Sequence, residues 1–135
     1  MGNHALMSSS NKNPWKRLLS NIKLSAKYGS KGASFSKYES IEEKELSVTW
    51  VDLKQLFESQ QNKCYWLGIP LNPQDIFIPY HPLSISVDRL DNNKGYIKEN
   101  IVITARLANI GRGACGDTDF SQIVEWIKDY YRDDE

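Results

Sequence analysis

The residues with the most chemical potential gather in one segment, residues 84–113 (SISVDRLDNNKGYIKENIVITARLANIGRG). Seven of its side chains offer carboxylate or amide oxygens, and the three that form the candidate set are those of Asp88, Asn100 and Asn109. A hard divalent cation such as Mg²⁺ prefers oxygen ligands and keeps several waters, so one carboxylate and one amide can be enough to hold it. Each residue alone is ordinary, because Asp and Asn in turns usually bond nearby backbone. Their joint spacing is what indicates a site.

The same segment predicts a strand, a loop, a second strand and a short helix. Residues 84–88 alternate polar and apolar side chains, which is typical of a strand. Residues 91–95 have the composition of a turn, and residues 101–104 form a β-branched run that indicates a second strand. Residues 105–110 favour a helix, which glycines at 111 and 113 would end.

This segment resembles the core of the HNH, or ββα-metal, endonucleases. In that family a strand ends in Asp-His, a loop carries an Asn before the second strand, and a helix supplies a His or Asn. The DRLDN, KGY, EN and ANxGR pieces look like the versions in phage-encoded HNH endonucleases, and upstream CYWLGIPL resembles the knuckle that precedes their core. The resemblance spans residues 62–112. It implies an α+β fold, a ββα-metal core with flanking N-terminal and C-terminal helices.

The resemblance also implies an activity, which is metal-dependent hydrolysis of phosphodiester bonds in DNA by a phage or mobile-element endonuclease. Asp88 and Asn109 would bind one Mg²⁺ or Mn²⁺ ion per active site. Asn100 would belong to the catalytic set by holding the long loop through its backbone. The cation would neutralise charge that develops on the phosphate and on the leaving oxygen.

The first departure from the family is Arg89, which stands where the usual member has its general-base histidine. A guanidinium does not lose its proton at working pH, so Arg89 would instead bind the scissile phosphate through two hydrogen bonds. We expect His81 to be the base, because histidine can exchange a proton near neutral pH. His81 could equally fill a proline-rich turn, and Tyr80 and Tyr96 are the reserve candidates.

The second departure concerns structural zinc. Many relatives brace the site with two Cys-x-x-Cys pairs, at positions that here read Cys64 and Leu67, then Ala105 and Ala108. One sulfur out of four cannot hold a structural Zn²⁺. We therefore expect a packed apolar contact at these positions. We also expect elemental analysis of the purified protein to find no stoichiometric zinc.

The charges of the chain are balanced in number but uneven in distribution. There are 17 basic and 17 acidic residues, yet residues 12–31 carry only basic charges and residues 117–135 carry mainly acidic ones. A basic end suits a polyanion, although both ends could simply be solvated helix faces. We predict DNA contacts at basic residues of the first helix and of the helix that carries Asn109, namely Lys16, Lys23, Lys27, Arg106 and Arg112.

The rest of the chain predicts further helices over residues 14–27, 50–61 and 120–131, with residues 28–47 as a loop or linker. The last helix has an apolar stripe that we assign to the core, and we assign all four tryptophans to inward faces. The stripe is formed by Phe120, Ile123, Val124, Ile127, Tyr130 and Tyr131. We expect a tail at residues 1–12, an N-terminal helical region with its linker at 13–61, and the nuclease core with the C-terminal helix at 62–135, in one compact domain.

Two other functions stay open at this point. A relative that has lost the usual histidine and the zinc could bind DNA without cutting it, and a turn-rich hairpin could serve a structural or protein-interaction role. No apolar run approaches the roughly 18 residues of a membrane span, and the first residues lack a secretory pattern, so we expect a cytoplasmic protein, in a host cell if phage-encoded. DNA is the expected partner, and a homodimer could extend the small footprint of one chain.

Overall fold

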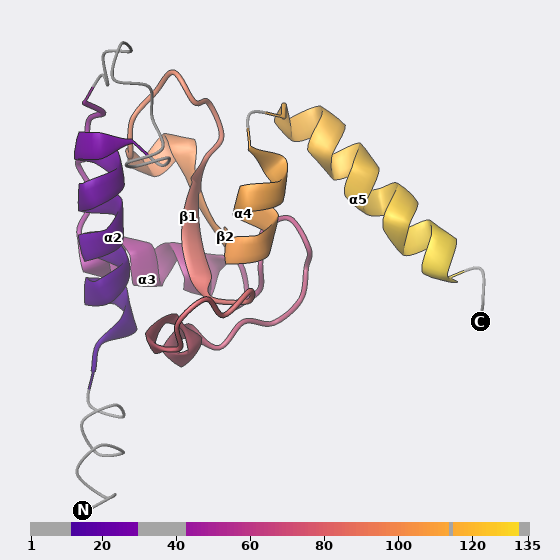
Figure 1. Cartoon of the computed structure of the whole chain (residues 1–135), viewed down its shortest axis with the longest axis horizontal. Coiled ribbons are helices and arrows are strands. Elements are labelled where there is room, and N and C mark those ends of the chain that lie inside the picture. Colours follow the sequence, from indigo (N-terminus) through magenta and orange to yellow (C-terminus); the bar gives the residue numbers. More distant parts are fainter. Residues whose placement is uncertain (1–11, 30–42, 114, 133–135) are drawn as a thin grey trace, which may run out of the picture.

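The structure is a computed structural model that describes residues 12–29, 43–113 and 115–132. In these ranges it is a mixed α+β protein with one two-stranded antiparallel sheet (Figure 1). The elements in chain order are α2 (Pro14–Tyr28), α3 (Trp50–Ser59), the 3₁₀ helix η2 (Pro73–Phe77), β1 (Ile85–Arg89), the 3₁₀ helix η3 (Lys98–Asn100), β2 (Ile101–Ala105), α4 (Arg106–Arg112) and α5 (Asp117–Arg132). The predicted helices and strands are confirmed, with ends shifted by at most three residues. The predicted tail, apart from Lys12, lies outside the described residues, as do residues 30–42 of the predicted linker.

Helix α2 forms where the sequence supplies both a cap and an apolar stripe. The side chain of Asn13 accepts hydrogen bonds from the backbone N–H groups of Trp15 and Lys16, and proline occupies the first helical position. One face of the helix is buried through Trp15, Leu18, Ile22 and Ala26. That face attaches α2 to the rest of the protein.

Helix α3 begins with a capping box. The Thr49 hydroxyl accepts from the backbone of Asp52, and the Asp52 carboxylate accepts from the backbone of Thr49. Leu53 and Phe57 are buried on its inner face, and the ring of Phe57 lies 5.4 Å from that of Trp15, between centroids. The two N-terminal helices therefore share one core.

Strands β1 and β2 form the hairpin on which the site is built. Their register runs from the pair Ile85 and Ala105 to the pair Arg89 and Ile101. Every residue of β2 is buried, which explains why its sequence is apolar apart from Thr104 and does not alternate with exposed polar residues. Helix α4 follows β2 directly and contacts both strands, whereas α2 lies on the other side of β1 (Figure 1).

The segment between α3 and η2 closes the free edge of β2. Tyr65 donates its backbone N–H to the carbonyl of Ile103, and the side-chain amide of Gln60 both donates to and accepts from the backbone of Ile103. A covered edge leaves few unpaired backbone groups to attract another strand. The same segment brings Trp66 beneath the end of β1.

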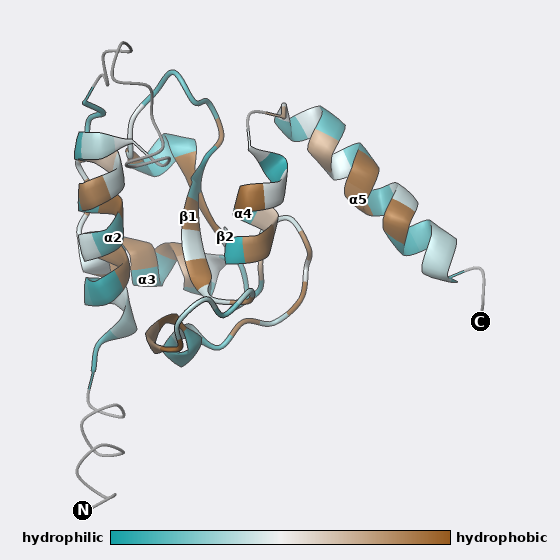
Figure 2. Ribbon diagram, viewed as in Figure 1, coloured by the Kyte–Doolittle hydropathy of each residue, from teal (hydrophilic) through white to brown (hydrophobic). Residues whose placement is uncertain are grey.

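The prediction for the last helix is right about its existence and wrong about its core. Phe120 packs edge-on against Trp66 at 5.3 Å between ring centroids, and Val124 is buried. The rest of the apolar stripe, formed by Ile123, Ile127, Tyr130 and Tyr131, is exposed, and so is Trp126 of the same helix. Figure 2 shows the most hydrophobic positions of α5 as brown segments of its ribbon. Periodicity reveals an apolar face but not what covers it, so Trp126 was wrongly assigned to the core. None of the helices described is long and apolar enough to cross a membrane.

Candidate functional site

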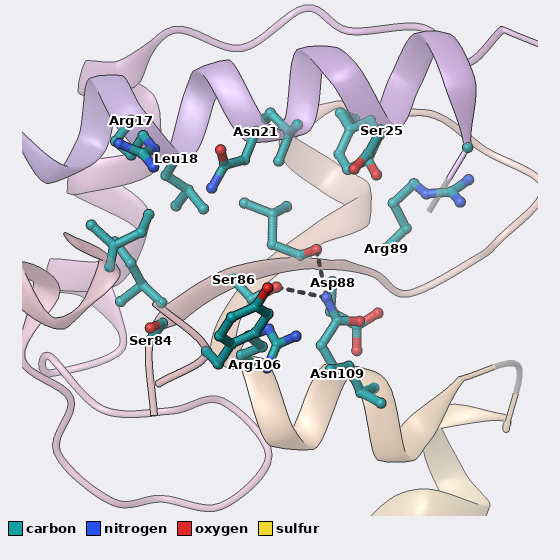
Figure 3. A pocket seen from close by; sticks show the side chains of 18 of the residues that line it. Arg17, Leu18, Asn21, Ser25, Ser84, Ser86, Asp88, Arg89, Arg106 and Asn109 are labelled. Carbon is teal, nitrogen blue, oxygen red and sulfur yellow. Dashed lines mark hydrogen bonds between the residues drawn. The ribbon is translucent and has the colours of Figure 1, made fainter. Parts of the chain in front are cut away.

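A cavity of about 1120 Å³ opens over β1, between α2 and α4 (Figure 3). Its floor is formed by residues 84–89. Side chains of α2 line one wall and side chains of α4, among them Arg106 and Asn109, line the other. The loop at residues 78–80 completes the lining. Asp88, Arg89 and Asn109, three of the residues predicted to form the site, therefore meet in one cavity.

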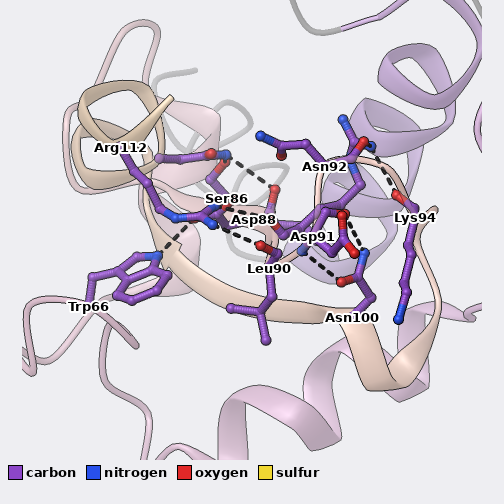
Figure 4. Close-up of polar contacts among 12 residues, drawn as sticks. Trp66, Ser86, Asp88, Leu90, Asp91, Asn92, Lys94, Asn100 and Arg112 are labelled. Atoms are coloured by element: carbon purple, nitrogen blue, oxygen red, sulfur yellow. Dashed lines mark hydrogen bonds and ion pairs between the residues drawn. The ribbon is translucent and has the colours of Figure 1, made fainter. Parts of the chain in front are cut away.

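Asp88 is buried near the end of β1 and is held by two donors (Figure 4). Its Oδ2 accepts from Trp66 Nε1 at 2.8 Å, and its Oδ1 accepts from a terminal nitrogen of Arg112 at 2.7 Å. Burial raises the pKa of the Asp88 carboxyl, while the Trp66 hydrogen bond and the Arg112 charge act against that rise. Each carboxylate oxygen has two lone pairs, so both keep one for a further partner.

Asn109 lies next to Asp88 and presents an amide oxygen (Figure 3). Its Nδ2 donates to Ser86 Oγ at 2.7 Å and to the carbonyl of Val87 at 3.2 Å. These two bonds fix the orientation of the amide against β1. No described residue donates a hydrogen bond to Asn109 Oδ1, and the side chain is only half-buried. This oxygen is therefore available to a ligand in the cavity.

The donor set of Asp88 and Asn109 fits a hard cation. One carboxylate and one outward amide oxygen match the ligands that Mg²⁺ and Mn²⁺ accept, and the open cavity leaves room for water and substrate oxygens to complete the coordination. Within the described residues, no group of three or more His, Cys, Asp or Glu side chains could hold a metal ion. The described chain thus offers two oxygen ligands, and water or substrate oxygens would have to supply the others.

Arg112 was predicted to contact DNA, and this prediction is wrong. Its side chain is only 2% exposed, and one terminal nitrogen donates to Asp88 and to the carbonyl of Arg89 at 3.0 Å. The other donates to the carbonyl of Leu90 at 2.9 Å, and the guanidinium lies over the ring of Trp66. Arg112 follows Asn109 by three residues and so shares its helix face, a signal that could have placed it beside Asp88.

Asn100 was predicted to hold the loop between the strands, and the structure confirms this (Figure 4). The side chain is buried, its Oδ1 accepts from the backbone of Asp91 at 2.8 Å, and its Nδ2 donates to the carbonyls of Asp91 and Gly95, both at 3.0 Å. Gly95 packs so closely on the backbone of Glu45 that a Cβ would clash. Asn100 does not line the cavity, so it is a positioning residue.

Arg89 lines the cavity but is also part of the loop's support. One terminal nitrogen donates to the carbonyls of Asn92 at 2.8 Å and Lys94 at 3.0 Å, and the guanidinium lies over the ring of Tyr96. Hydrogen bonds within the described chain use only this nitrogen of the guanidinium. The remaining N–H groups of Arg89 can therefore serve a phosphate oxygen in the cavity.

His81 is not placed to act as the predicted base. Its Nδ1 accepts from the backbone of Leu83 at 3.0 Å, and its Nε2 lies 3.6 Å from a carboxylate oxygen of Asp75. It does not line the cavity. His81 precedes β1, whereas Asp88 lies near the far end of that strand, three residues of about 3.3 Å each beyond Ile85. The alternative interpretation, a histidine that braces a proline-rich turn, agrees with these contacts.

The predicted lysine row of α2 does not face the cavity. At about 100° per residue, Lys16, Lys23 and Lys27 fall on one side of the buried stripe, and the polar residues of α2 that line the cavity fall on the other. Those are Arg17, Asn21 and Ser25, spaced four residues apart, and the sequence interpretation missed them. Arg106, the remaining predicted contact, does line the cavity.

The cavity is electropositive although the chain as a whole is neutral. Among the residues that the structure describes, four basic side chains line it, those of Arg17, Lys44, Arg89 and Arg106, against one acidic side chain, that of Asp88. The charge of Asp88 is already matched by Arg112. A concave site with an excess of one sign attracts ligands of the other sign, so the site favours an anion.

At the positions where many HNH nucleases carry zinc ligands, the predicted apolar contact is confirmed. The sulfur of Cys64 accepts from the backbone of Leu67 at 3.4 Å and of Ala105 at 3.2 Å, and it lies 2.9 Å from the hydroxyl of Thr104. Cys64, Ala105 and Ala108 are buried in the core, and Leu67 packs against it. The absence of zinc from the purified protein stays a prediction.

Comparison with known proteins adds no relative to this description: no protein-family model, curated protein or solved structure matches the chain.

Proposed function

We propose that the protein is a metal-dependent endonuclease that hydrolyses phosphodiester bonds in DNA, and that β1, β2 and α4 form a ββα-metal core. The observation that carries the proposal is the pairing of the Asp88 carboxylate with the outward amide oxygen of Asn109 in an electropositive cavity. Two oxygen ligands suit a hard cation, and the surrounding basic side chains suit a phosphate. The resemblance of residues 62–112 to HNH nucleases supports the same activity.

In the proposed reaction Asp88 and Asn109 would hold a Mg²⁺ or Mn²⁺ ion, which would supply charge neutralisation at the phosphate and a more acidic water. Arg112 and Trp66 keep the Asp88 carboxylate oriented. Arg89 donates its remaining N–H groups to a phosphate oxygen, which stabilises the charge of the transition state. Arg17 and Arg106 attract neighbouring phosphates of the same strand from opposite walls of the cavity.

The proposal assigns no histidine as the base. Among the residues that the structure describes, neither histidine nor glutamate lines the cavity, and a guanidinium cannot accept a proton. Tyr80 and Tyr96, the reserve candidates, do line the cavity, but the proposal assigns the proton of the attacking water to solvent. We therefore expect the cleavage rate to rise with pH through the neutral range without the plateau that a histidine base would give.

The test is plasmid nicking in Mg²⁺ or Mn²⁺ by the wild type and three single variants. Asn109→Ala removes the amide oxygen and should reduce nicking by at least the roughly 10- to 100-fold that loss of a partner around a metal site costs. Asn109→Asp restores an oxygen ligand and should recover part of the activity. His81→Ala should nick like the wild type. An inactive wild type, or an Asn109→Ala variant with full activity, would contradict the proposal.

A second candidate is a protein that binds DNA without cutting it. The observation that favours it is that both carboxylate oxygens of Asp88 already accept hydrogen bonds, while Arg89 stands at the usual position of the base. This candidate predicts DNA affinity that falls steeply as salt rises, with no nicking in any divalent cation. Measuring binding and nicking on the same preparation separates the two.

A further inference from the structure

Tyr80 is the most exposed large apolar side chain of the described chain, and it lies at the cavity. Its side chain is 86% exposed, and its backbone adopts φ +59°, the left-handed region. Residues other than glycine rarely adopt this conformation, which costs roughly 1–2 kcal/mol. Neither burial nor ease of folding accounts for a tyrosine there. A strained residue that lines a cavity is a reason to consider a functional role.

Hydrogen bonds and a histidine–aspartate contact fix the loop that carries Tyr80. The backbone N–H of His81 donates to the carbonyl of Ile78 at 3.3 Å, and the imidazole of His81 accepts from Leu83 and faces Asp75. The hydroxyl of Ser84 donates to the carbonyl of Asp75 at 3.1 Å. Prolines on both sides of Tyr80 and His81 restrict the backbone further. These contacts hold the tyrosine in its exposed position, and they give His81 a structural role.

A cation accompanies the exposed ring. The guanidinium of Arg106 lies 6.0 Å from the centroid of the Tyr80 ring, and both residues line the cavity that contains Asp88 and Asn109. A planar aromatic ring beside a planar cation is the pairing on which nucleobases stack in proteins that bind single strands. The ring is thus within the same cavity as the proposed phosphate site.

We infer that Tyr80, supported by Arg106, is a stacking platform for an unpaired nucleobase next to the phosphate bound in the cavity. In a duplex the faces of each base are covered by its neighbours, so a ring can stack only on a base that is unpaired or extruded. The inference rests on the proposed function, because it places the substrate strand in that cavity. It narrows the substrate to single-stranded or locally unpaired nucleic acid.

The test measures binding rather than cleavage. A fluorescently labelled single-stranded oligonucleotide, the same strand with abasic sites and a blunt duplex are titrated in EDTA with the full chain. Loss of one stacked base costs about 5- to 150-fold in affinity, so Tyr80→Ala should weaken single-strand binding by that factor. Tyr80→Phe keeps the ring and should bind within about twofold of wild type. The abasic strand should bind weakly and should not respond to either change.

A matched control is Tyr130→Ala, which removes a tyrosine that is 70% exposed on α5, outside the cavity. This variant should bind like the wild type. Equal affinity of Tyr80→Ala and wild type for the single strand would overturn the inference, as would an equal loss on the abasic strand or no binding by the wild type. Because no metal is needed, base-dependent binding without nicking would refute the nuclease and keep the platform. Nicking at the wild-type rate by Tyr80→Ala would keep the nuclease and refute the platform.

Discussion

The two ends of the β1–β2 hairpin carry different kinds of contact. At the end where Ile85 pairs with Ala105, the buried sulfur of Cys64 contacts the backbone of Ala105 and the hydroxyl of Thr104 and, within the described residues, no charged side chain. At the other end, the buried Asp88 carboxylate and the Arg112 guanidinium form an ion pair beneath the cavity. One hairpin is therefore held by packing at one end and by a buried charge pair at the other.

This difference indicates where stability and where function are located. Replacing a buried ion pair with apolar side chains of similar volume is often neutral or stabilising, because desolvation offsets the attraction between the charges. In the part of the chain that the structure describes, the Cys64 end of the hairpin is held together without a charged side chain. A buried charge pair at the other end is therefore more easily explained by function than by stability, which agrees with the proposed role of Asp88 as a ligand.

The largest expected effect comes from leaving one buried charge without its partner. Arg112→Met removes the cation and leaves the Asp88 carboxylate uncompensated, so the free energy of unfolding should fall by about 3–5 kcal/mol. Removing the opposing charge raises the pKa of Asp88 further above its ordinary value. A carboxyl whose pKa is raised in the folded state loses stability as pH rises through that pKa, so the deficit should shrink at acid pH. Urea unfolding in EDTA at several pH values measures both effects.

The control for this prediction is the double variant Asp88→Asn with Arg112→Met. It removes both charges, so most of the lost stability should return while any nicking activity is abolished. A double variant as unstable as the single one would mean that Arg112 acts through its carbonyl contacts with Arg89 and Leu90 instead of through its charge.

A smaller loss of stability is expected from a change in the loop between β1 and β2, next to the charged end. Asn100→Ala removes three hydrogen bonds inside a buried site, each worth about 1 kcal/mol, so unfolding should become easier by about 2–3 kcal/mol. Asn93, an exposed asparagine of the same loop, is the matched control, and Asn93→Ala should stay within about 0.5 kcal/mol of wild type. Thermal denaturation of both variants checks this. Equal stabilities would show that the loop does not depend on Asn100.

The apolar end should respond more weakly still and without loss of function. Cys64→Ala removes one buried sulfur and its two backbone contacts, at a cost of about 1 kcal/mol. Nicking and oligonucleotide affinity should not change, because Cys64 does not line the cavity. If this variant lost activity as fully as Asn109→Ala, the division between a packing end and a functional end would be wrong.

The parts of the molecule that could be predicted from sequence are those fixed by local chemistry. Asn13 and Thr49 cap their helices through residues two or three positions away, and Asn100 bonds a loop at most nine residues distant. Such contacts follow from residue type and spacing. The oxygen pair of Asp88 and Asn109 could be predicted only with the help of a family resemblance.

The parts that could not be predicted depend on which elements meet in space. Arg112 and Arg106 are both basic residues of α4, yet one is buried on Asp88 and the other lines the cavity, because only one helix face meets β1. On α2, likewise, the lysine row points away from the cavity whereas Arg17, Asn21 and Ser25 line it. The apolar stripe of α5 satisfies helical periodicity, but after Val124 it meets little of the rest of the described chain.

The smallest effect is expected from a surface ion pair, Asp52 with Lys98, which joins α3 to the loop at the charged end of the hairpin. Asp52 of α3 accepts from the backbone of Thr49 and pairs with Lys98 of η3 at 3.2 Å, two residues before Asn100. The backbone hydrogen bond, and after it the bond from Lys98, lower the pKa of Asp52.

A carboxyl whose pKa is lowered by folding stabilises the folded state at a pH above its unfolded-state pKa. This stabilisation is lost as the pH falls through its folded-state pKa. Wild type should therefore be slightly more stable than Asp52→Asn at neutral pH, and this difference should disappear as the pH falls below about 4. Chemical denaturation at matched pH, with Lys98→Met as the second variant, measures the two contributions. If Lys98→Met removed the pH dependence entirely, the surface pair and not the helix cap would be the group that links α3 to the charged end.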